Sequence, residues 1–143
     1  MEQLKKITKV LVFLFISGLT LSCSDSDDMD PVAMNEMMNA NTIIFDGSFV
    51  SDGHPTSGTV EVIMETNELL FKNFKTDKGP NLDVVLATSL DYTDYITISD
   101  LQGIEGNYSY DLPTNTNLTK YKYVVIWCVD FSVSFGHAEL KMP

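Results

Sequence analysis

The chain has two cysteines, and each lies where a thiol could carry chemistry. Cys23 follows an apolar N-terminal run, at the position where exported bacterial proteins are cleaved and lipidated. Cys128 lies near the other end, in the segment Tyr-Val-Val-Ile-Trp-Cys-Val-Asp-Phe. If Cys23 is modified, Cys128 is a lone thiol outside the reducing cytosol, where a cysteine is normally paired, reactive or deeply buried.

The two histidines are the side chains that could assist this thiol. His54 belongs to a His-Pro-Thr-Ser-Gly turn, and His137 lies on the strand expected to follow Cys128 in a hairpin. Either imidazole could ligate a metal or haem, or lower the pKa of a neighbouring thiol. The alternatives are an exposed turn histidine at position 54 and a surface strand histidine at position 137.

Other catalytic and metal-binding patterns are missing from the sequence. It contains no Gly-x-Ser-x-Gly, no His-Glu-x-x-His, no glycine-rich phosphate loop and, from residue 41 onward, no EF-hand calcium loop. Four methionines near the N-terminus could offer soft ligands to Cu(I), but no His or Cys accompanies Met29, Met34, Met37 and Met38. We therefore expect no metal site and no enzyme that turns over alone.

The N-terminal segment is typical of a signal peptide followed by a lipid anchor. Three lysines precede the apolar run from residue 10 to 21, which as a helix would cover about 18 Å, too short to cross a membrane. We expect residues 1–22 to be a signal peptide and Cys23 to be lipidated, although plain cleavage would leave an ordinary thiol. The acidic residues 24–28 resemble the export signal of surface lipoproteins in Bacteroidetes-type bacteria, which favours the outer face of the outer membrane over the periplasmic face.

The charge of the chain limits its partners. The net charge is −11, and it becomes −13 without residues 1–22, since three lysines and one glutamate leave. Such a chain is repelled by phosphate backbones and anionic lipids, so we expect no nucleic acid partner and membrane attachment only through the lipid at Cys23. Residues 23–40, acidic and rich in methionine, read as a tether.

From residue 41 to 143 the pattern changes to period-two segments separated by turns. The absence of amphipathic helical periodicity between them predicts an all-β domain, a single antiparallel β-sandwich or barrel of about eight strands. The expected strands are 43–50, 59–65, 69–74, 82–87, 95–99, 107–112, 121–129 and 132–140. In the second of these, Val60, Val62 and Met64 should share one face.

The segment 121–129 is apolar on both faces, as in a central strand covered on each side. Cys128 should therefore be at least partly buried, and a core cysteine packs as a small hydrophobe. We expect aromatic side chains to supply much of the core, namely Phe45, Phe49, Phe71, Phe74, Tyr123, Trp127, Phe131 and Phe135.

Four residues around these strands have expected structural roles. Gly79 and Pro80 form a turn, and Asp83 behind it should bind the backbone amides of that turn. Trp127, which precedes Cys128 in the chain and should point to the opposite face of the strand, is expected to be a structural residue.

Several short motifs occur in an order that resembles the DM-thirteen (DM13) domain, the electron-transfer family also found in the animal protein Skeletor. They are Gly-Ser-Phe at 47–49, His-Pro-Thr-Ser-Gly-Thr-Val at 54–60, the run 74–86 around Lys-Gly-Pro-Asn-Leu-Asp, Gly-Asn-Tyr-Ser-Tyr-Asp-Leu-Pro at 106–113, and Val-Val-Ile-Trp-Cys at 124–128 through Phe-Gly at 135–136. The resemblance covers about residues 43–141.

The resemblance implies an extracellular β-rich domain whose characteristic cysteine corresponds to Cys128. In the family that cysteine is proposed to act as a redox thiol or to ligate a prosthetic group such as haem. Animal members carry a haem- or sugar-binding partner domain beside it, so here we expect the redox partner to be a separate protein or a bound cofactor.

Two functional hypotheses follow. The first is a redox or electron-transfer module that uses Cys128, with His54 or His137 as a helper. The second is a non-catalytic surface binding module for a glycan or protein, with Cys128 in the core and the loops 52–58 or 91–95 in contact with the partner.

Overall fold

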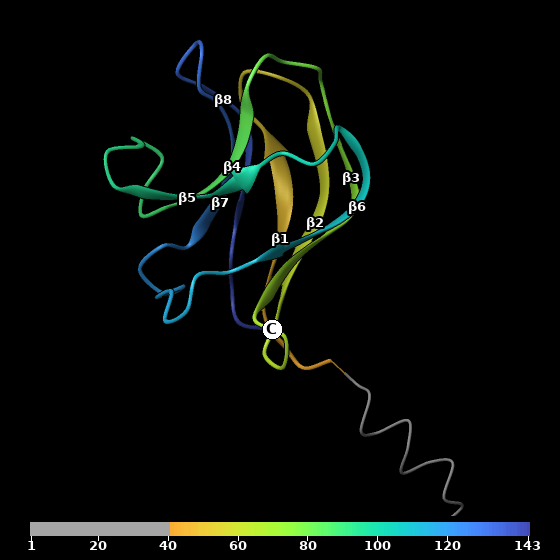
Figure 1. Ribbon diagram of the computed structural model, residues 1–143, viewed down its shortest axis with the longest axis vertical. Coiled ribbons are helices and arrows are strands. Elements are labelled where there is room, and N and C mark those ends of the chain that lie inside the picture. The colour runs from red at the N-terminus through yellow and green to blue at the C-terminus, as the bar shows by residue number, and fades with distance from the viewer. Residues whose placement is uncertain (1–40) are drawn as a thin grey trace, which may run out of the picture.

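The computed structural model describes residues 41–143, and they form eight β-strands without an α-helix (Figure 1). The strands are β1 (Ile43–Ser51), β2 (Thr56–Ile63), β3 (Glu68–Thr76), β4 (Leu82–Ala87), β5 (Tyr95–Asp100), β6 (Glu105–Asp111), β7 (Tyr123–Cys128) and β8 (Val133–Glu139). Over this range no helix is long and apolar enough to cross a membrane. The predicted all-β class and strand number are confirmed, and most strand ends fall within a few residues of expectation.

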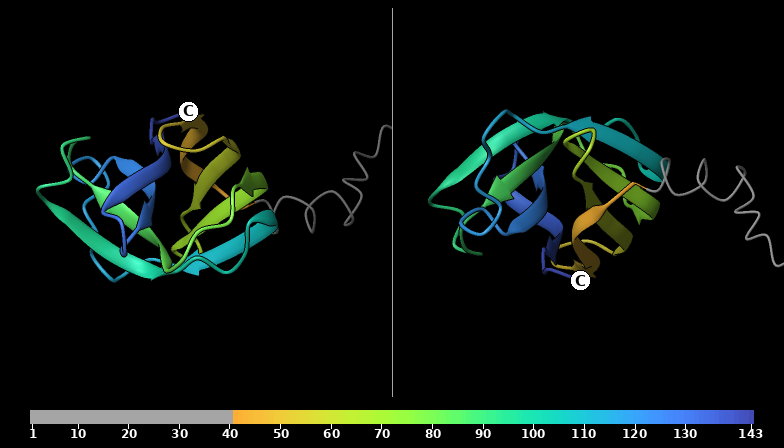
Figure 2. Two further views of the ribbon diagram at one scale, coloured as in Figure 1. Left: turned by 90° about the horizontal axis from the view of Figure 1, so that it is seen from above. Right: turned by 90° about the horizontal axis from the view of Figure 1, so that it is seen from below.

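All eight strands belong to one sheet, with the order β5-β4-β7-β8-β1-β2-β3-β6 and antiparallel pairing throughout. The sheet curls around a central core, as the views along its long axis show (Figure 2). Its two edge strands, β5 and β6, are consecutive in the chain and approach each other, joined by residues 101–104. The architecture is thus a half-barrel made from a single sheet rather than two stacked sheets.

The inner face of the sheet holds the main core, which includes Cys128 and Phe135. Phe49 packs edge-on against two other rings, with centroid distances of 4.9 Å to Phe71 and 5.1 Å to Phe74. Offset and edge-to-face arrangements of this kind are the favoured ones for aromatic pairs. Aromatic side chains therefore do supply much of the core, as expected.

Two side chains lie outside against expectation, since Phe131 was predicted in the core and Met64 on one face with Val60 and Val62. Phe131 is 71% exposed because it lies in the turn between β7 and β8, where neither strand covers it. Met64 is 58% exposed because β2 ends at Ile63, and the chain then enters a turn in which Asn67 has a φ of 54°. In both cases the alternating sequence pattern continues past the residue at which strand pairing ends.

The strand β7 is covered on both faces, as its sequence predicted. Val124, Ile126 and Cys128 point into the main core, while Val125 lies in a second cluster on the outer face. That outer cluster also contains Val85, Ala87, Tyr92, Tyr123 and Trp127. Pairing with β4 on one side and β8 on the other makes β7 central in the sheet.

Candidate functional site

Cys128 is the last residue of β7 and has no solvent-exposed surface. Its thiol donates a hydrogen bond to the backbone carbonyl of Pro80, with 3.2 Å between Sγ and the oxygen. Pro80 itself is exposed, so a single turn of backbone separates the sulfur from solvent. In this conformation the thiol is sealed.

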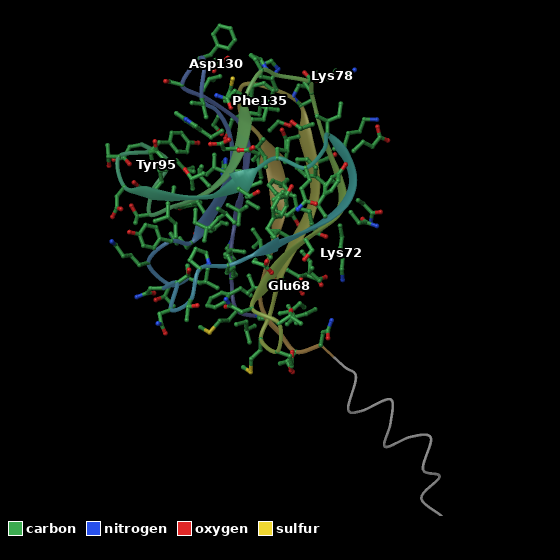
Figure 3. The ribbon with its side chains drawn as sticks, viewed as in Figure 1. Glu68, Lys72, Lys78, Tyr95, Asp130 and Phe135 are labelled. Atoms are coloured by element: carbon green, nitrogen blue, oxygen red, sulfur yellow. The ribbon has the colours of Figure 1, made fainter. Side chains whose placement is uncertain are left out.

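The covering turn is fixed by contacts to β8 and to the turn that follows β7. A Cβ added to Gly79 would lie 2.5 Å from Cζ of Phe135, so only a glycine lets the turn approach the buried ring this closely. The Asn81 side chain donates to Asp130 over 3.1 Å, and the amide of Val129 donates to the carbonyl of Asn81 over 3.0 Å. Lys78, Asp130 and Phe135 accordingly lie at one end of the molecule (Figure 3). We call residues 79–81 the cap.

A surface depression of about 300 Å³ lies against the cap. It is lined by Gly79, Asn81, Leu82, Asp100, Leu101 and Ile104. Leu82 also lies directly opposite Cys128 in the β4–β7 pair and belongs to the same core. One leucine side chain therefore faces both the depression and the neighbourhood of the thiol.

His54 lies at the capped end but does not bond to Cys128. Its Nδ1 is 3.1 Å from a carboxylate oxygen of Asp77, and its ring stacks on Phe135 with a centroid distance of 3.8 Å. Phe135 in turn contacts the Gly79 position. His54 is therefore linked to the cap through the Phe135 ring and has no hydrogen bond to the Cys128 sulfur.

His137 lies on the other face of the sheet from Cys128. It pairs with Val125 of the outer cluster, and its Nδ1 is 2.9 Å from both carboxylate oxygens of Asp52. Cys128 points to the inner face of the same sheet. The backbone of β7 and β8 thus separates the imidazole from the thiol.

Asp52, expected only as part of the loop 52–58, is also a site residue. Besides His137, its Oδ2 accepts a hydrogen bond from Ser134 over 2.6 Å and lies 3.4 Å from the phenol oxygen of Tyr92. The side chains of His137 and Asp52 are only 16% and 25% exposed. One carboxylate therefore links the end of β1, strand β8 and the loop of residues 88–94.

Tyr92 completes this arrangement from a strained backbone position. Its φ is 56°, a left-handed conformation that is unusual for a bulky side chain and costs of order 1 kcal/mol or more. Its ring packs on Trp127 with a centroid distance of 4.8 Å, and Tyr95 approaches the same indole at 6.4 Å. Burial raises the pKa of the Tyr92 phenol above its usual value, which keeps it protonated.

The sequence model of the family described as "Electron transfer DM13" matches residues 48–140. The chain belongs to this family. The match runs from within β1 to just beyond β8, and it includes Cys128, His54, His137 and Trp127. Searches among curated proteins and solved structures gave no significant match. Membership of the DM13 family associates the chain with electron transfer.

A haem at Cys128 does not fit this arrangement of the DM13 domain. The sulfur has no exposed surface, donates to Pro80 and lies within the main core, so no open coordination position faces it. No group of three or more His, Cys, Asp or Glu side chains within residues 41–143 is placed to hold a metal ion. We therefore assign no cofactor-dependent step to Cys128.

The remaining predicted residues of the DM13 domain have the following places. Gly79 and Pro80 form the cap, and Trp127 packs in the outer cluster. Asp83 faces Asp100 across the β4–β5 pair, and burial first, then the charge of Asp100, raises the pKa of Asp83. No hydrogen bond joins its carboxylate to the turn amides among the contacts found for residues 41–143. Cys23 and the tether lie outside the described residues.

Proposed function

We propose that this chain is an exported, lipid-anchored electron-transfer protein in which Cys128 is a thiol shielded by the cap. The observation that carries the proposal is the hydrogen bond from the buried thiol to Pro80, an exposed residue of a short turn. On this proposal the thiol is protected at rest, and displacement of the cap exposes it. The family match supports the electron-transfer role.

The chemistry available to such a thiol is exchange with a disulfide of a separate partner protein. In that step a bond forms between Cys128 Sγ and one partner sulfur while the partner disulfide breaks. The other partner sulfur leaves as a thiolate, and the proton of Cys128 passes to solvent. The number of disulfides is unchanged in this step: Cys128 ends in a mixed disulfide with one partner sulfur, and the other partner sulfur carries the bonding electron pair away as a thiolate.

Two leucine variants test whether the cap is what shields the thiol. Leu82→Ala removes the side chain between the depression and Cys128, whereas Leu86→Ala removes a leucine from the same strand and face, opposite Val124. We expect both variants to lose stability, since both leave a cavity. Only in Leu82→Ala should iodoacetamide alkylate Cys128 faster than the variant unfolds globally, by about tenfold or more.

The measurement is mass spectrometry of the alkylated protein over time, with urea unfolding of each variant beside it. Equal acceleration in the two variants, or labelling that always follows global unfolding, would contradict a cap. Glutathione disulfide then serves as the probe of redox chemistry. A mixed disulfide with Leu82→Ala, absent in Leu82→Ala/Cys128→Ala, supports exchange at this residue.

The lipid anchor is a separate part of the proposal and rests on Cys23. The acidic residues 24–28 support a position on the outer face of the outer membrane. Cys23→Ser should move the protein from the membrane fraction to the soluble fraction. The Cys128→Ala control should remain in the membrane fraction. Protease access in intact cells distinguishes the outer from the periplasmic face.

A second candidate function is a binding module for a glycan or protein at the outer face. Its support is that the loops 52–58 and 91–95, far apart in sequence, are brought together by the contact between Asp52 and Tyr92. If Cys128 stays unreactive in Leu82→Ala while Tyr92→Ala abolishes binding to a glycan array, this second function replaces the first.

A further inference from the structure

The outer face of the domain carries a compact group of oxidisable side chains. Trp127, the only tryptophan of the chain, contacts Tyr92 with ring centroids 4.8 Å apart and Tyr95 at 6.4 Å. Tyr95 is 45% exposed and stands at the margin of the molecule beside β5 (Figure 3). Indole and phenol are, with thiols, the side chains that most readily lose one electron.

Tyr92 differs from an ordinary packed tyrosine in two respects. Its left-handed backbone is unfavourable for an aromatic residue, and it places the ring between Trp127 and Asp52. Its phenol oxygen lies 3.4 Å from a carboxylate that can accept a proton. Strained backbone of this kind persists where the surrounding structure holds it, and it concentrates at functional sites.

We propose that Trp127 and Tyr92 form a one-electron relay, with Asp52 as the proton acceptor of Tyr92. The relay rests on the proposed electron-transfer function and names the groups through which charge would enter or leave. Its natural partner would be a one-electron acceptor, such as a metal-centred redox protein, docked over the exposed Tyr95 side. The exposed Tyr95 marks where the acceptor docks, and the partly buried Tyr92 is the residue on which the radical ends.

The electrons and protons of this relay balance. The acceptor takes one electron from Trp127 and is reduced, which leaves the indole as a radical cation. Tyr92 then gives one electron to the indole while its O–H bond breaks and the proton moves to Asp52. The products are a neutral tyrosyl radical, a protonated carboxyl and a restored Trp127, and reduction from a donor reverses each step.

His137 and Ser134 hold the proton acceptor in place. Both bond to Asp52, at 2.9 Å and 2.6 Å, so the carboxylate cannot rotate away from Tyr92 without losing those contacts. They act on the relay only through Asp52 and are positioning residues. A base within hydrogen-bond reach of the proton it accepts is the geometric requirement for such a transfer, and these distances often tighten during the reaction.

The Cys128 thiol has no comparable proton acceptor among the described residues. Within residues 41–143 the only hydrogen-bond partner of the Cys128 thiol is a backbone carbonyl, which cannot retain a proton. Trp127 and Cys128 are neighbours in the chain but point to opposite faces of the sheet. One-electron chemistry is therefore assigned to the outer aromatic group, and the capped thiol remains available for thiol–disulfide exchange.

Flash photolysis of the purified protein tests the relay. Photogenerated tris(bipyridine)ruthenium(III) serves as the one-electron oxidant, and the full chain carries Cys128→Ala so that the thiol cannot contribute. We expect a tryptophan radical that decays as a tyrosyl radical rises. Tyr92→Phe should lengthen the tryptophan radical lifetime by about tenfold or more and lower the tyrosyl yield.

Two further variants sharpen the outcome. Tyr123→Phe is the matched control, because Tyr123 lies in the same outer cluster but forms no aromatic pair with Trp127. It should leave the decay unchanged. Asp52→Asn keeps the shape but removes the proton acceptor, and should slow the transfer and lower its solvent deuterium isotope effect.

Equal lifetimes in Tyr92→Phe and Tyr123→Phe would overturn the relay, as would an Asp52→Asn variant with unchanged kinetics. Near-ultraviolet circular dichroism of each variant checks that the aromatic group is intact. Because every sample lacks the Cys128 thiol, failure of the relay leaves the tests of Cys128 untouched. Conversely, an inert Cys128 in the alkylation series leaves the radical kinetics as an independent result.

Discussion

His137 and Asp52 are 85 residues apart in the chain, yet Nδ1 of the imidazole lies 2.9 Å from both oxygens of the carboxylate. The pair joins the end of β1 to β8 on the outer face of the sheet. Asp52, and not Cys128, is therefore the partner of this histidine. The other histidine is likewise engaged elsewhere, with Asp77 and Phe135.

Replacement of Cys128 should show that the sulfur is part of the core. Because the side chain is fully buried, Cys128→Ala should lower the free energy of unfolding by about 1 kcal/mol or more. Urea unfolding with an unchanged m-value measures this loss. Val129→Ala is the control, since that residue is next in the chain but 42% exposed, and it should change stability by about 0.5 kcal/mol or less. A Cys128→Ala variant as stable as wild type would place the thiol outside the core.

Haem should not bind through Cys128 in the folded protein. The sulfur donates to Pro80 and is enclosed by the main core, so a macrocycle has no route to it. We expect haemin titration to give the same visible spectrum with wild type and Cys128→Ala. A Soret shift present in wild type and lost in the variant would show instead that the cap opens to admit a ligand.

Asp83 should weaken the fold at neutral pH. Burial, and then the charge of Asp100, raises the pKa of Asp83 in the folded protein. Since the folded state holds this proton more tightly than the unfolded state, stability is lost as the pH rises through the two pKa values. Asp83→Asn should therefore be more stable than wild type at neutral pH, by about 0.5 kcal/mol or less because the side chain is partly solvated.

The comparison across pH identifies the cause. The advantage of Asp83→Asn should disappear at about pH 3, where the wild-type carboxyl is protonated in both states. Asp100→Asn should also stabilise, because it removes the second cause of the shift. A destabilised Asp83→Asn would instead support the role predicted from sequence, in which the carboxylate binds the turn.

Gly79 should tolerate no side chain. A Cβ there would lie 2.5 Å from Phe135 and 3.0 Å from Leu82, so Gly79→Ala must displace the cap or the ring. We expect a loss of about 1–3 kcal/mol together with faster alkylation of Cys128. Gly103→Ala is a comparison at a second glycine, which is crowded by the Tyr108 side chain and not by Phe135 or Leu82. It should lose stability without the faster labelling.

Much of the fold follows from local patterns in the sequence. Alternation located β4 at residues 82–87, and the doubly apolar segment around Ile126 predicted a central strand with Cys128 at least partly buried. Alternation cannot show where pairing stops, and for that reason Met64 and Phe131 were assigned to the wrong environment. Strand order was also beyond reach, because the curl of the sheet depends on contacts between distant segments.

The site was predictable only in part, for a related reason. The cysteine, the two histidines and the Gly-Pro turn could be named from residue types, but their partners lie 23 to 85 residues away. Asp52 has no local signal that distinguishes it from other loop carboxylates. The left-handed Tyr92 is likewise invisible in the sequence, because the ring on which it packs, Trp127, belongs to a strand distant in the chain.

The curl of the sheet also bears on self-association. Unpaired edge strands are templates for pairing with another chain, which is a hazard for proteins crowded at high concentration. Here β5 and β6 approach each other, and Gln102 lies between them. Its side chain donates a hydrogen bond to the Ser109 carbonyl, and its backbone amide donates one to the Tyr110 phenol oxygen. Each edge thus partly blocks access to the other. The approach of β5 to β6, which leaves the barrel unclosed, should therefore keep neighbouring copies from pairing edge to edge into a continuous sheet.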